Sequence, residues 1–143
     1  EKKTLSEKLQ QRISDYTRQG GNLMLSGSYL GSILPANLAQ NTLKFTHGGS
    51  MYGVTTGQVF GANTTLSFPT QVNEKSYAVP APDCLLPTAG AYSTFVYTPG
   101  NYGAGIAYKG TDFRTFVLGF PFESIDNAQH RSRIMKAALD LFK

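Results

Sequence analysis

The stretch Phe116-Val117-Leu118-Gly119-Phe120-Pro121-Phe122-Glu123-Ser124-Ile125 decides the fold that we predict for this chain. It opens with an apolar run that suits a buried strand, and it breaks at glycine and proline. The carboxylate of Glu123 follows the break, and helical spacing of apolar residues begins soon after. In open α/β sheets, ligands and reacting groups gather beyond the carboxyl ends of such strands. The stretch therefore predicts an α/β fold with Glu123 at a candidate site.

A second apolar run, Leu23-Met24-Leu25, has the same character. Apolar residues at successive positions are typical of a strand buried on both faces in a parallel sheet between helices. A last helix should run to the C-terminus, with Asp126 and Gln129 placed to cap its start. We predict that the strands at 23–25 and 116–118 are parallel neighbours or near-neighbours, covered by the first and last helices.

The first predicted helix lies close to the start of the chain. Thr4 and Glu7 fit a capping box, apolar residues then follow helical spacing, and Gly20-Gly21 supplies the stop. A shorter helix is predicted after Pro35, ending near His47-Gly48-Gly49.

The middle of the chain, from about residue 50 to residue 110, shows no helical period and is rich in Gly, Thr, Tyr and Phe. Residues 64–68 read as a strand, and residues 93–98 and 105–109 read as a hairpin. Residues 73–87 contain several prolines and are predicted to be irregular. We therefore expect a β-rich Gly/Tyr insertion within one domain.

Composition excludes several classes of protein. With 143 residues, of which 41% are hydrophobic and 15% charged, the chain indicates one soluble globular domain. No apolar run is long enough for membrane insertion. The net charge of +4 is modest, and the basic residues are spread along the two terminal helices, so no nucleic-acid partner is expected.

The sequence predicts neither a metal site nor a cofactor. The single cysteine, Cys84, rules out an internal disulfide framework and a multi-cysteine zinc site, and its neighbours do not favour a thiolate. His47 and His130 have no acidic residue spaced to join them as ligands. The glycine-rich run at 100–105 falls in a hairpin, which is the wrong context for a phosphate loop.

Three segments carry a resemblance to a known family. They are Thr17-Arg18-Gln19-Gly20-Gly21-Asn22-Leu23-Met24-Leu25-Ser26-Gly27-Ser28-Tyr29, residues 117–125 and the helix at 131–141. Together they resemble class I glutamine amidotransferase-like domains, in particular the degenerate versions in large secreted bacterial proteins, some of which are described as xanthan lyases. The resemblance implies a three-layer α/β/α, flavodoxin-like fold and a secreted, periplasmic or cell-surface location.

The same resemblance implies where the site lies. Active members place a cysteine on the elbow after the first of these strands, and a histidine and a glutamate in a Phe-His-Pro-Glu-Ser type motif after the later strand. Here Ser28 is the positional match to the cysteine, within one residue, and Gly27 and Tyr29, which flank it, are candidate binding residues. Glu123 matches the glutamate, but Pro121 stands where the histidine belongs. A serine without an adjacent base is a weak nucleophile.

Domains of this family also open with a strand–helix–strand portion before the helix that begins here near Thr4. The chain starts at Glu1 instead of a methionine. We therefore expect residues 1–143 to be the C-terminal part of one amidotransferase-like domain. Its partner would be either the remaining N-terminal part or a second chain that completes the sheet.

Three functions stay open on these grounds. The first is a non-catalytic accessory or interaction domain within a larger exported protein. The second is a hydrolase or amidase that uses Ser28 as nucleophile, His47 as a displaced base and Glu123. The third is a carbohydrate-binding module whose tyrosines, Tyr97 and Tyr102 among them, form a flat exposed face.

Overall fold

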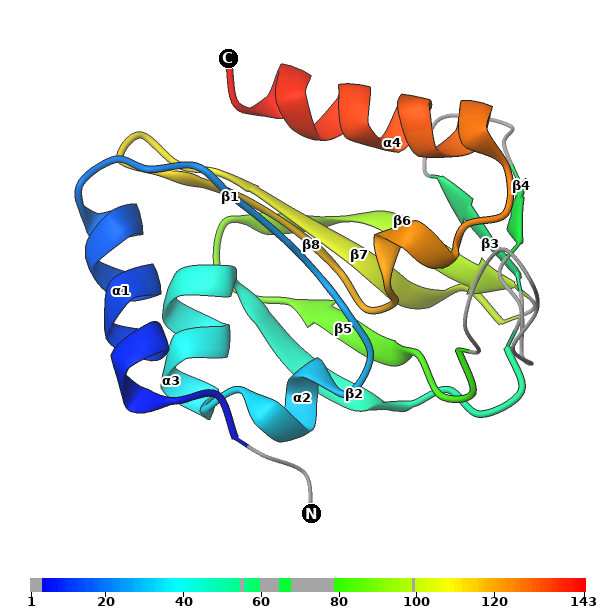
Figure 1. The fold of residues 1–143 in the computed structure, drawn as a ribbon, viewed down its shortest axis with the longest axis horizontal. Helices are drawn as coiled ribbons and strands as arrows, with labels where there is room; N and C mark the ends of the chain where they lie inside the picture. Colours follow the sequence, from blue (N-terminus) through cyan, green and yellow to red (C-terminus); the bar gives the residue numbers. More distant parts are fainter. Residues whose placement is uncertain (1–3, 55, 60–64, 68–78, 99) are drawn as a thin grey trace.

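A mixed sheet forms the centre of this α/β structure, a computed structural model that describes residues 4–54, 56–59, 65–67, 79–98 and 100–143 (Figure 1). Its strand order is β1-β8-β7-β6-β3-β4. β1 and β8 run parallel, and each of the other neighbouring pairs is antiparallel. The strands are β1 (Leu23–Ser26), β3 (Thr56–Val59), β4 (Thr65–Ser67), β6 (Ala91–Thr98), β7 (Tyr102–Lys109) and β8 (Arg114–Leu118).

A smaller antiparallel sheet pairs β2 (Phe45–Ser50) with β5 (Asp83–Pro87). Its register shifts between His47 and Gly49, which marks a bulge. The helical elements are α1 (Glu7–Arg18), α2 (Leu30–Ile33), α3 (Ala36–Leu38), the π-helical turn η1 (Ala39–Leu43), the 3₁₀ turn η2 (Phe122–Ser124) and α4 (Ala128–Leu141). None of the described helices has the length and apolar character that a bilayer span requires.

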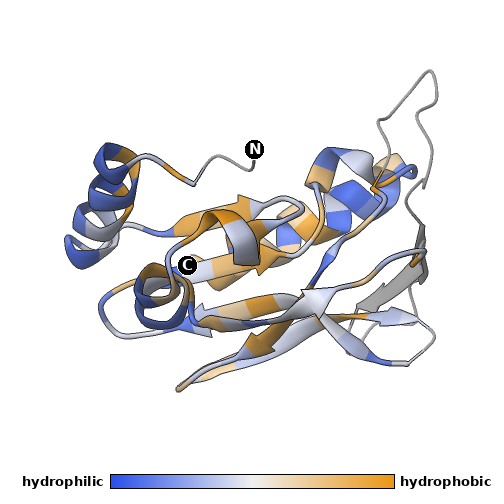
Figure 2. Cartoon of the chain, turned by 90° about the horizontal axis from the view of Figure 1, so that it is seen from below, coloured by the Kyte–Doolittle hydropathy of each residue, from blue (hydrophilic) through white to orange (hydrophobic). Residues whose placement is uncertain are grey.

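The sheet separates two apolar clusters. Ile134, Ala138 and Leu141 of α4 pack with Phe116 and Leu118 of β8 on one face. The intervening residue of β8, Val117, belongs to the cluster on the opposite face, which contains residues of α2, α3, η1, β2 and β5. This alternation follows from the two-residue period of a strand. Figure 2 shows the apolar positions gathered along the strands, while α1 is largely hydrophilic.

The predicted parallel pairing of the strands at 23–25 and 116–118 is confirmed, and it lies at one end of the six-stranded sheet. Leu23 pairs with Thr115 and Leu25 with Val117 in a parallel register. The hairpin predicted in the middle zone is also confirmed, as β6 and β7, and β4 lies within the predicted strand at 64–68. α4 covers one face of the sheet, and α1 contributes Ile13 to the cluster on the other.

Both predicted helix caps were one or two residues out of place. Ser6, not Thr4, caps α1 and accepts a hydrogen bond from the Leu9 amide at 3.4 Å. Asn127, not Asp126, caps α4, where its side chain accepts from the Gln129 and His130 amides. Ser, Thr, Asp and Asn are all favoured at helix N-caps, so residue type alone did not decide between Thr4 and Ser6 or between Asp126 and Asn127.

Two segments differ from the prediction more substantially. The helix expected to reach His47 ends instead at Leu43, and the left-handed φ of 65° at its C-cap, Lys44, turns the chain into β2. The segment predicted as irregular contains β5 at its end, because residues 83–85 are buried and pair with β2. Residues 73–78 of that segment, which include Tyr77, lie outside the described residues. Phe60 lies outside them as well.

Candidate functional site

A sharp elbow joins the end of β1 to α2. Tyr29 adopts φ 62° and ψ 20°, a left-handed conformation that is uncommon for a residue with a bulky side chain. α2 begins at the next residue, Leu30. Such backbone strain persists only where the surroundings enforce it, and it is frequent at functional turns. The strained elbow position is thus occupied by Tyr29, one residue beyond the sequence match at Ser28.

Ser28 is not positioned as an activated nucleophile. Its hydroxyl oxygen is buried, and it has no hydrogen-bond partner among the described residues. His47, the residue that sequence reasoning placed as its base, directs its Nε2 atom elsewhere. A hydroxyl that gives its proton to no base stays protonated and reacts slowly.

The partner of His47 is Asp83, at the start of β5. His47 Nε2 lies 3.1 Å from Asp83 Oδ1, and a carboxylate oxygen can only accept, so Nε2–H donates. The other carboxylate oxygen accepts from the Leu30 amide, and Gly31 N–H also donates to this carboxylate. Asp83 is fully buried, whereas the His47 side chain is 31% exposed. One carboxylate therefore joins β2, β5 and the first turn of α2.

The main chain of Asp83 is also enclosed. Its amide donates to the Gly119 carbonyl at 2.6 Å, and its carbonyl accepts from the Tyr97 hydroxyl at 2.8 Å. A Cβ atom on Gly119 would lie 2.2 Å from the Asp83 carbonyl oxygen, so only glycine permits this approach. The Gly119 of the opening motif thus serves to admit β5 against the end of β8.

Electrostatics at this position reflect burial. Desolvation raises the pKa of Asp83 above its ordinary value, although the His47 charge and the amide hydrogen bonds act in the opposite direction. Burial likewise raises the pKa of the neighbouring Cys84 thiol. Cys84 is buried on β5 and is not at the elbow, so the one thiol of the chain is neither exposed nor activated.

The His47 ring lies against the elbow helix. A Cβ atom placed on Gly31 would fall 2.0 Å from His47 Cγ, so the glycine leaves the space that the ring fills. The ring borders a cavity of about 200 Å³ that Leu34, Phe45 and Thr46 also line. The lining is mixed, with polar Gln40 and Thr46 beside apolar Leu34 and Phe45, and Ser28 is not among the lining residues.

The later motif lies at the same edge of the sheet as the elbow. β1 and β8 end together, and the Phe122 amide donates to Ser26 Oγ at 3.2 Å. Gly27 donates its amide to the Leu118 carbonyl at 3.3 Å. Glu123 follows on η2 and is exposed. Pro121, which stands at the position that the resemblance matched to a histidine, is buried, and proline can neither accept nor release a proton there.

Tyr97 cannot belong to the flat exposed face that sequence reasoning considered. Tyr97 is fully buried, its hydroxyl is bound to Asp83, and its ring meets Phe120 edge-on. That assignment was wrong, because an inward position on β6 serves the core. Tyr102 is 53% exposed and packs over Gly100 at the hairpin turn.

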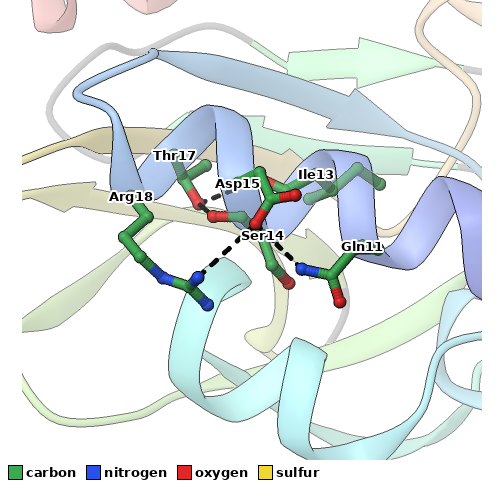
Figure 3. A network of polar contacts seen from close by, with 6 residues as sticks. All are labelled: Gln11, Ile13, Ser14, Asp15, Thr17 and Arg18. Carbon is green, nitrogen blue, oxygen red and sulfur yellow. Dashed lines mark hydrogen bonds and ion pairs between the residues drawn. The ribbon is translucent and has the colours of Figure 1, made fainter.

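A larger cavity of about 350 Å³ lies between α1, η1 and the turn at Asp112. Ser14, Arg18, Asn41 and Phe113 are among its lining residues. Figure 3 shows the polar contacts along α1: Asp15 accepts from Gln11 and Arg18, while the Thr17 hydroxyl donates to carbonyls of its own helix. These contacts connect residues of α1 with one another.

Within the described residues, no group of three or more potential ligands (His, Cys, Asp or Glu) is arranged to hold a metal ion. Asp83 and His47 are two such groups, but the carboxylate already accepts from the Leu30 and Gly31 amides. The pair acts as a hydrogen-bonded clamp on the elbow.

Comparisons with known proteins bear on the fold. No family model matches the sequence, and no curated protein matches it. The mmIFT52 N-terminal domain superposes with a TM-score of 0.62 at 13% identity, covering 97% of this chain and 72% of that one. A β-galactosidase from the Antarctic haloarchaeon Halorubrum lacusprofundi gives a TM-score of 0.65 at 17% identity, covering 96% of this chain and 20% of that one. Gan42B, a GH42 β-galactosidase from G. stearothermophilus, gives 0.65 at 12% identity, covering 96% and 20%.

These likenesses establish a shared fold and nothing more, because the identities are low. The chain spans about one fifth of the length of either galactosidase.

Asp83 is the site residue that sequence reasoning missed. Asp83 directly precedes the apolar run Cys84-Leu85-Leu86. A carboxylate at the start of a buried strand needs hydrogen-bond partners, and this is the sequence feature that could have identified it. The sequence separation from His47 and Leu30 hid the contact, since the topology of β2 and β5 had not been predicted.

Proposed function

We propose that this chain is a non-catalytic interaction domain on a degenerate class I glutamine amidotransferase-like scaffold, within a larger exported protein. One observation carries the proposal. His47, the nearest histidine to the elbow helix, donates its Nε2 proton to Asp83, while the Ser28 hydroxyl is buried without a partner among the described residues. The nucleophile and base that hydrolysis needs are therefore not joined.

The elbow itself supports the assignment to this scaffold. A strained residue between a parallel strand and a short helix is the feature on which amidotransferase-like domains mount their cysteine, and here Tyr29 holds that position. Helices on both faces of the sheet support the finer assignment to a three-layer, flavodoxin-like fold. The antiparallel pairs beyond β8 are a departure from a fully parallel sheet.

An accessory role is supported by the setting of the structural neighbours. In the two galactosidases the matching region is about one fifth of the chain, so a domain of this fold occurs as a minor part of larger proteins. The assignment to an exported parent protein, related to the xanthan lyase group, has its support in the sequence resemblance.

The test is ammonia release from glutamine by the chain, with Ser28→Ala and His47→Ala beside it. We expect no release above the buffer blank for any of the three proteins. A positioned general base typically accelerates such a reaction ~10²–10⁴-fold, so an active serine–histidine pair would raise ammonia release well above the blank. Turnover that disappears in Ser28→Ala would overturn the proposal and identify a serine-dependent amidase.

A further inference from the structure

We propose that the cavity beside His47 is a binding site for a phenol group, supplied either by a tyrosine side chain of a partner protein or by a free phenol. The cavity has a volume of about 200 Å³. Its walls come from α2, α3, η1 and β2, which lie together in Figure 1. An apolar cavity of roughly 150 Å³ is enough to hold benzene, so the space admits one aromatic ring.

The inner part of the cavity is apolar. Leu34, Ala39 and Phe45 are the buried members of its lining, whereas the polar side chains Gln40 and Thr46 are exposed. An aromatic ring placed on these buried residues would be stabilised by the removal of its apolar surface from water. A sugar of similar size would bring several hydroxyl groups to the same residues, where they would lack partners, and such burial is costly. The lining therefore favours an apolar ring over a polyol.

His47 supplies a hydrogen-bond acceptor to this cavity. Its Nε2 atom donates to the buried Asp83 carboxylate, which fixes the tautomer and leaves a lone pair on Nδ1. Within the part of the chain that the structure describes, no hydrogen bond reaches Nδ1. The ring lies against Gly31, which also lines the cavity, and a Cβ atom on Gly31 would fall 2.5 Å from Nδ1. The acceptor is thus at the wall of the cavity.

The ligand that suits this lining is neutral and carries one donor. No Asp, Glu, Lys or Arg is among the described residues that line the cavity, so no fixed charge favours an ionic ligand. A phenol joins an apolar ring to one hydroxyl group, and a tyrosine side chain has the same chemistry. Aromatic side chains that fill such pockets are frequent anchors of protein interfaces. The ring would rest on Leu34 and Phe45 while its hydroxyl donates to His47 Nδ1.

The experiment compares p-cresol with toluene, which lacks the hydroxyl group. Binding of each to the chain is followed by nuclear magnetic resonance titration and is repeated with His47→Phe and with His130→Phe. Phenylalanine keeps a ring and removes the acceptor. His130 is the matched control, because it lies on α4, on the other face of the sheet. For ligands of this size we expect dissociation constants on the order of 1 mM.

We expect the chain and His130→Phe to bind p-cresol about threefold to tenfold more tightly than toluene, which is the ratio that one net hydrogen bond provides. In His47→Phe this preference should disappear. If His47→Phe does not fold, the nitrogen resonance of His47 Nδ1 in the unmodified chain decides: p-cresol should shift it and toluene should not. N-acetyl-tyrosinamide distinguishes the two sources. It should bind at least as tightly as p-cresol if the site accepts a tyrosine within a polypeptide, and more weakly if the site takes free phenols.

Three results would overturn the inference. One is the absence of saturable p-cresol binding, and another is equal affinity of the chain for p-cresol and toluene. The third is a preference for p-cresol that persists in His47→Phe, or a Nδ1 resonance that p-cresol leaves unchanged, because another group would then accept the hydroxyl proton. None of these results depends on ammonia release from glutamine, so failure here and failure of the proposed function are told apart.

Discussion

Asp83 connects several segments around the elbow. Its carboxylate accepts from the Leu30 and Gly31 amides and from His47, and its main chain is bound by Gly119 and Tyr97. A fully buried carboxylate is costly unless it is hydrogen-bonded in this way. We therefore expect the elbow to be sensitive to substitution of this one residue.

Replacing Asp83 by alanine should destabilise the chain by about 1–3 kcal/mol, because the buried amides of α2 lose their acceptor. Urea unfolding followed by circular dichroism measures the change. Asp112→Ala is the matched control, since Asp112 is exposed and its side chain bonds only to Thr111 among the described residues. Equal effects of the two substitutions would contradict this role for Asp83.

Asp83 should also give stability a pH dependence of definite sign. Burial raises the pKa of Asp83, so the folded chain holds this proton more tightly than the unfolded chain does. The stabilisation is complete below the unfolded pKa of about 3.9 and is lost as pH rises through the raised folded value. Relative to Asp83→Asn, the free energy of unfolding of the unmodified chain should therefore fall across that interval.

Asp140 provides the opposite case on the surface. Hydrogen bonds from Lys136 and Lys143 lower the pKa of Asp140 to about 2. Its contribution is present above the unfolded pKa and is lost as pH falls toward about 2. Unfolding should therefore be followed in the Asp140→Asn background, which removes this slope. Parallel pH profiles for that background with and without the Asp83→Asn substitution would contradict the sign assigned to Asp83.

At the scale of elements, the approach of β5 to the end of β8 depends on a missing side chain. Gly119→Ala would place a Cβ atom 2.2 Å from the Asp83 carbonyl oxygen and 2.9 Å from the Tyr97 hydroxyl. A backbone oxygen cannot move away cheaply, so we expect a loss of about 1–3 kcal/mol or more. Gly27→Ala is the control, because its Cβ would meet only the Leu30 side chain, at 3.3 Å. Comparable thermal midpoints for both variants would contradict the packing described here.

The packing of α4 on the sheet gives a second prediction at this scale. Ile134 is 1% exposed and lies in the cluster with Phe116 and Leu118. Ile134→Ala should therefore lower the free energy of unfolding by about 2–5 kcal/mol. Leu139, on the same helix, is 54% exposed, and Leu139→Ala should change it by less than about 0.5 kcal/mol. Chemical denaturation of both variants checks the difference.

The elements that the sequence predicted are those with a local signal. Two-sided apolarity identified β1 and β8, and spacing identified α1 and α4. β2 was missed because His47-Gly48-Gly49 reads as a turn, and its pairing depends on β5, which is distant in the chain. Ser28 and Glu123 follow strands that end at one sheet edge, as the parallel pairing predicts, whereas no local pattern links Asp83 to the elbow.

At the scale of the whole molecule, the proposed function depends on which residue His47 is hydrogen-bonded to, Asp83 or Ser28. Because His47 is hydrogen-bonded to the buried carboxylate of Asp83, it does not serve Ser28 as a base. The Asp83 clamp connects the two sheets, because the main chain of Asp83 on β5 is bound by Gly119 after β8 and by Tyr97 of β6.

The most direct test of the clamp is the imidazole spectrum of His47 by nuclear magnetic resonance. We predict a Nε2–H tautomer whose proton is hydrogen-bonded to Asp83. Its ring resonances should be unchanged in Ser28→Ala and should shift in Asp83→Asn, with His130 as the internal control in both spectra. Resonances of His47 that move in Ser28→Ala and stay in place in Asp83→Asn would show a serine–histidine pair, and would contradict the account of a structural, non-catalytic elbow.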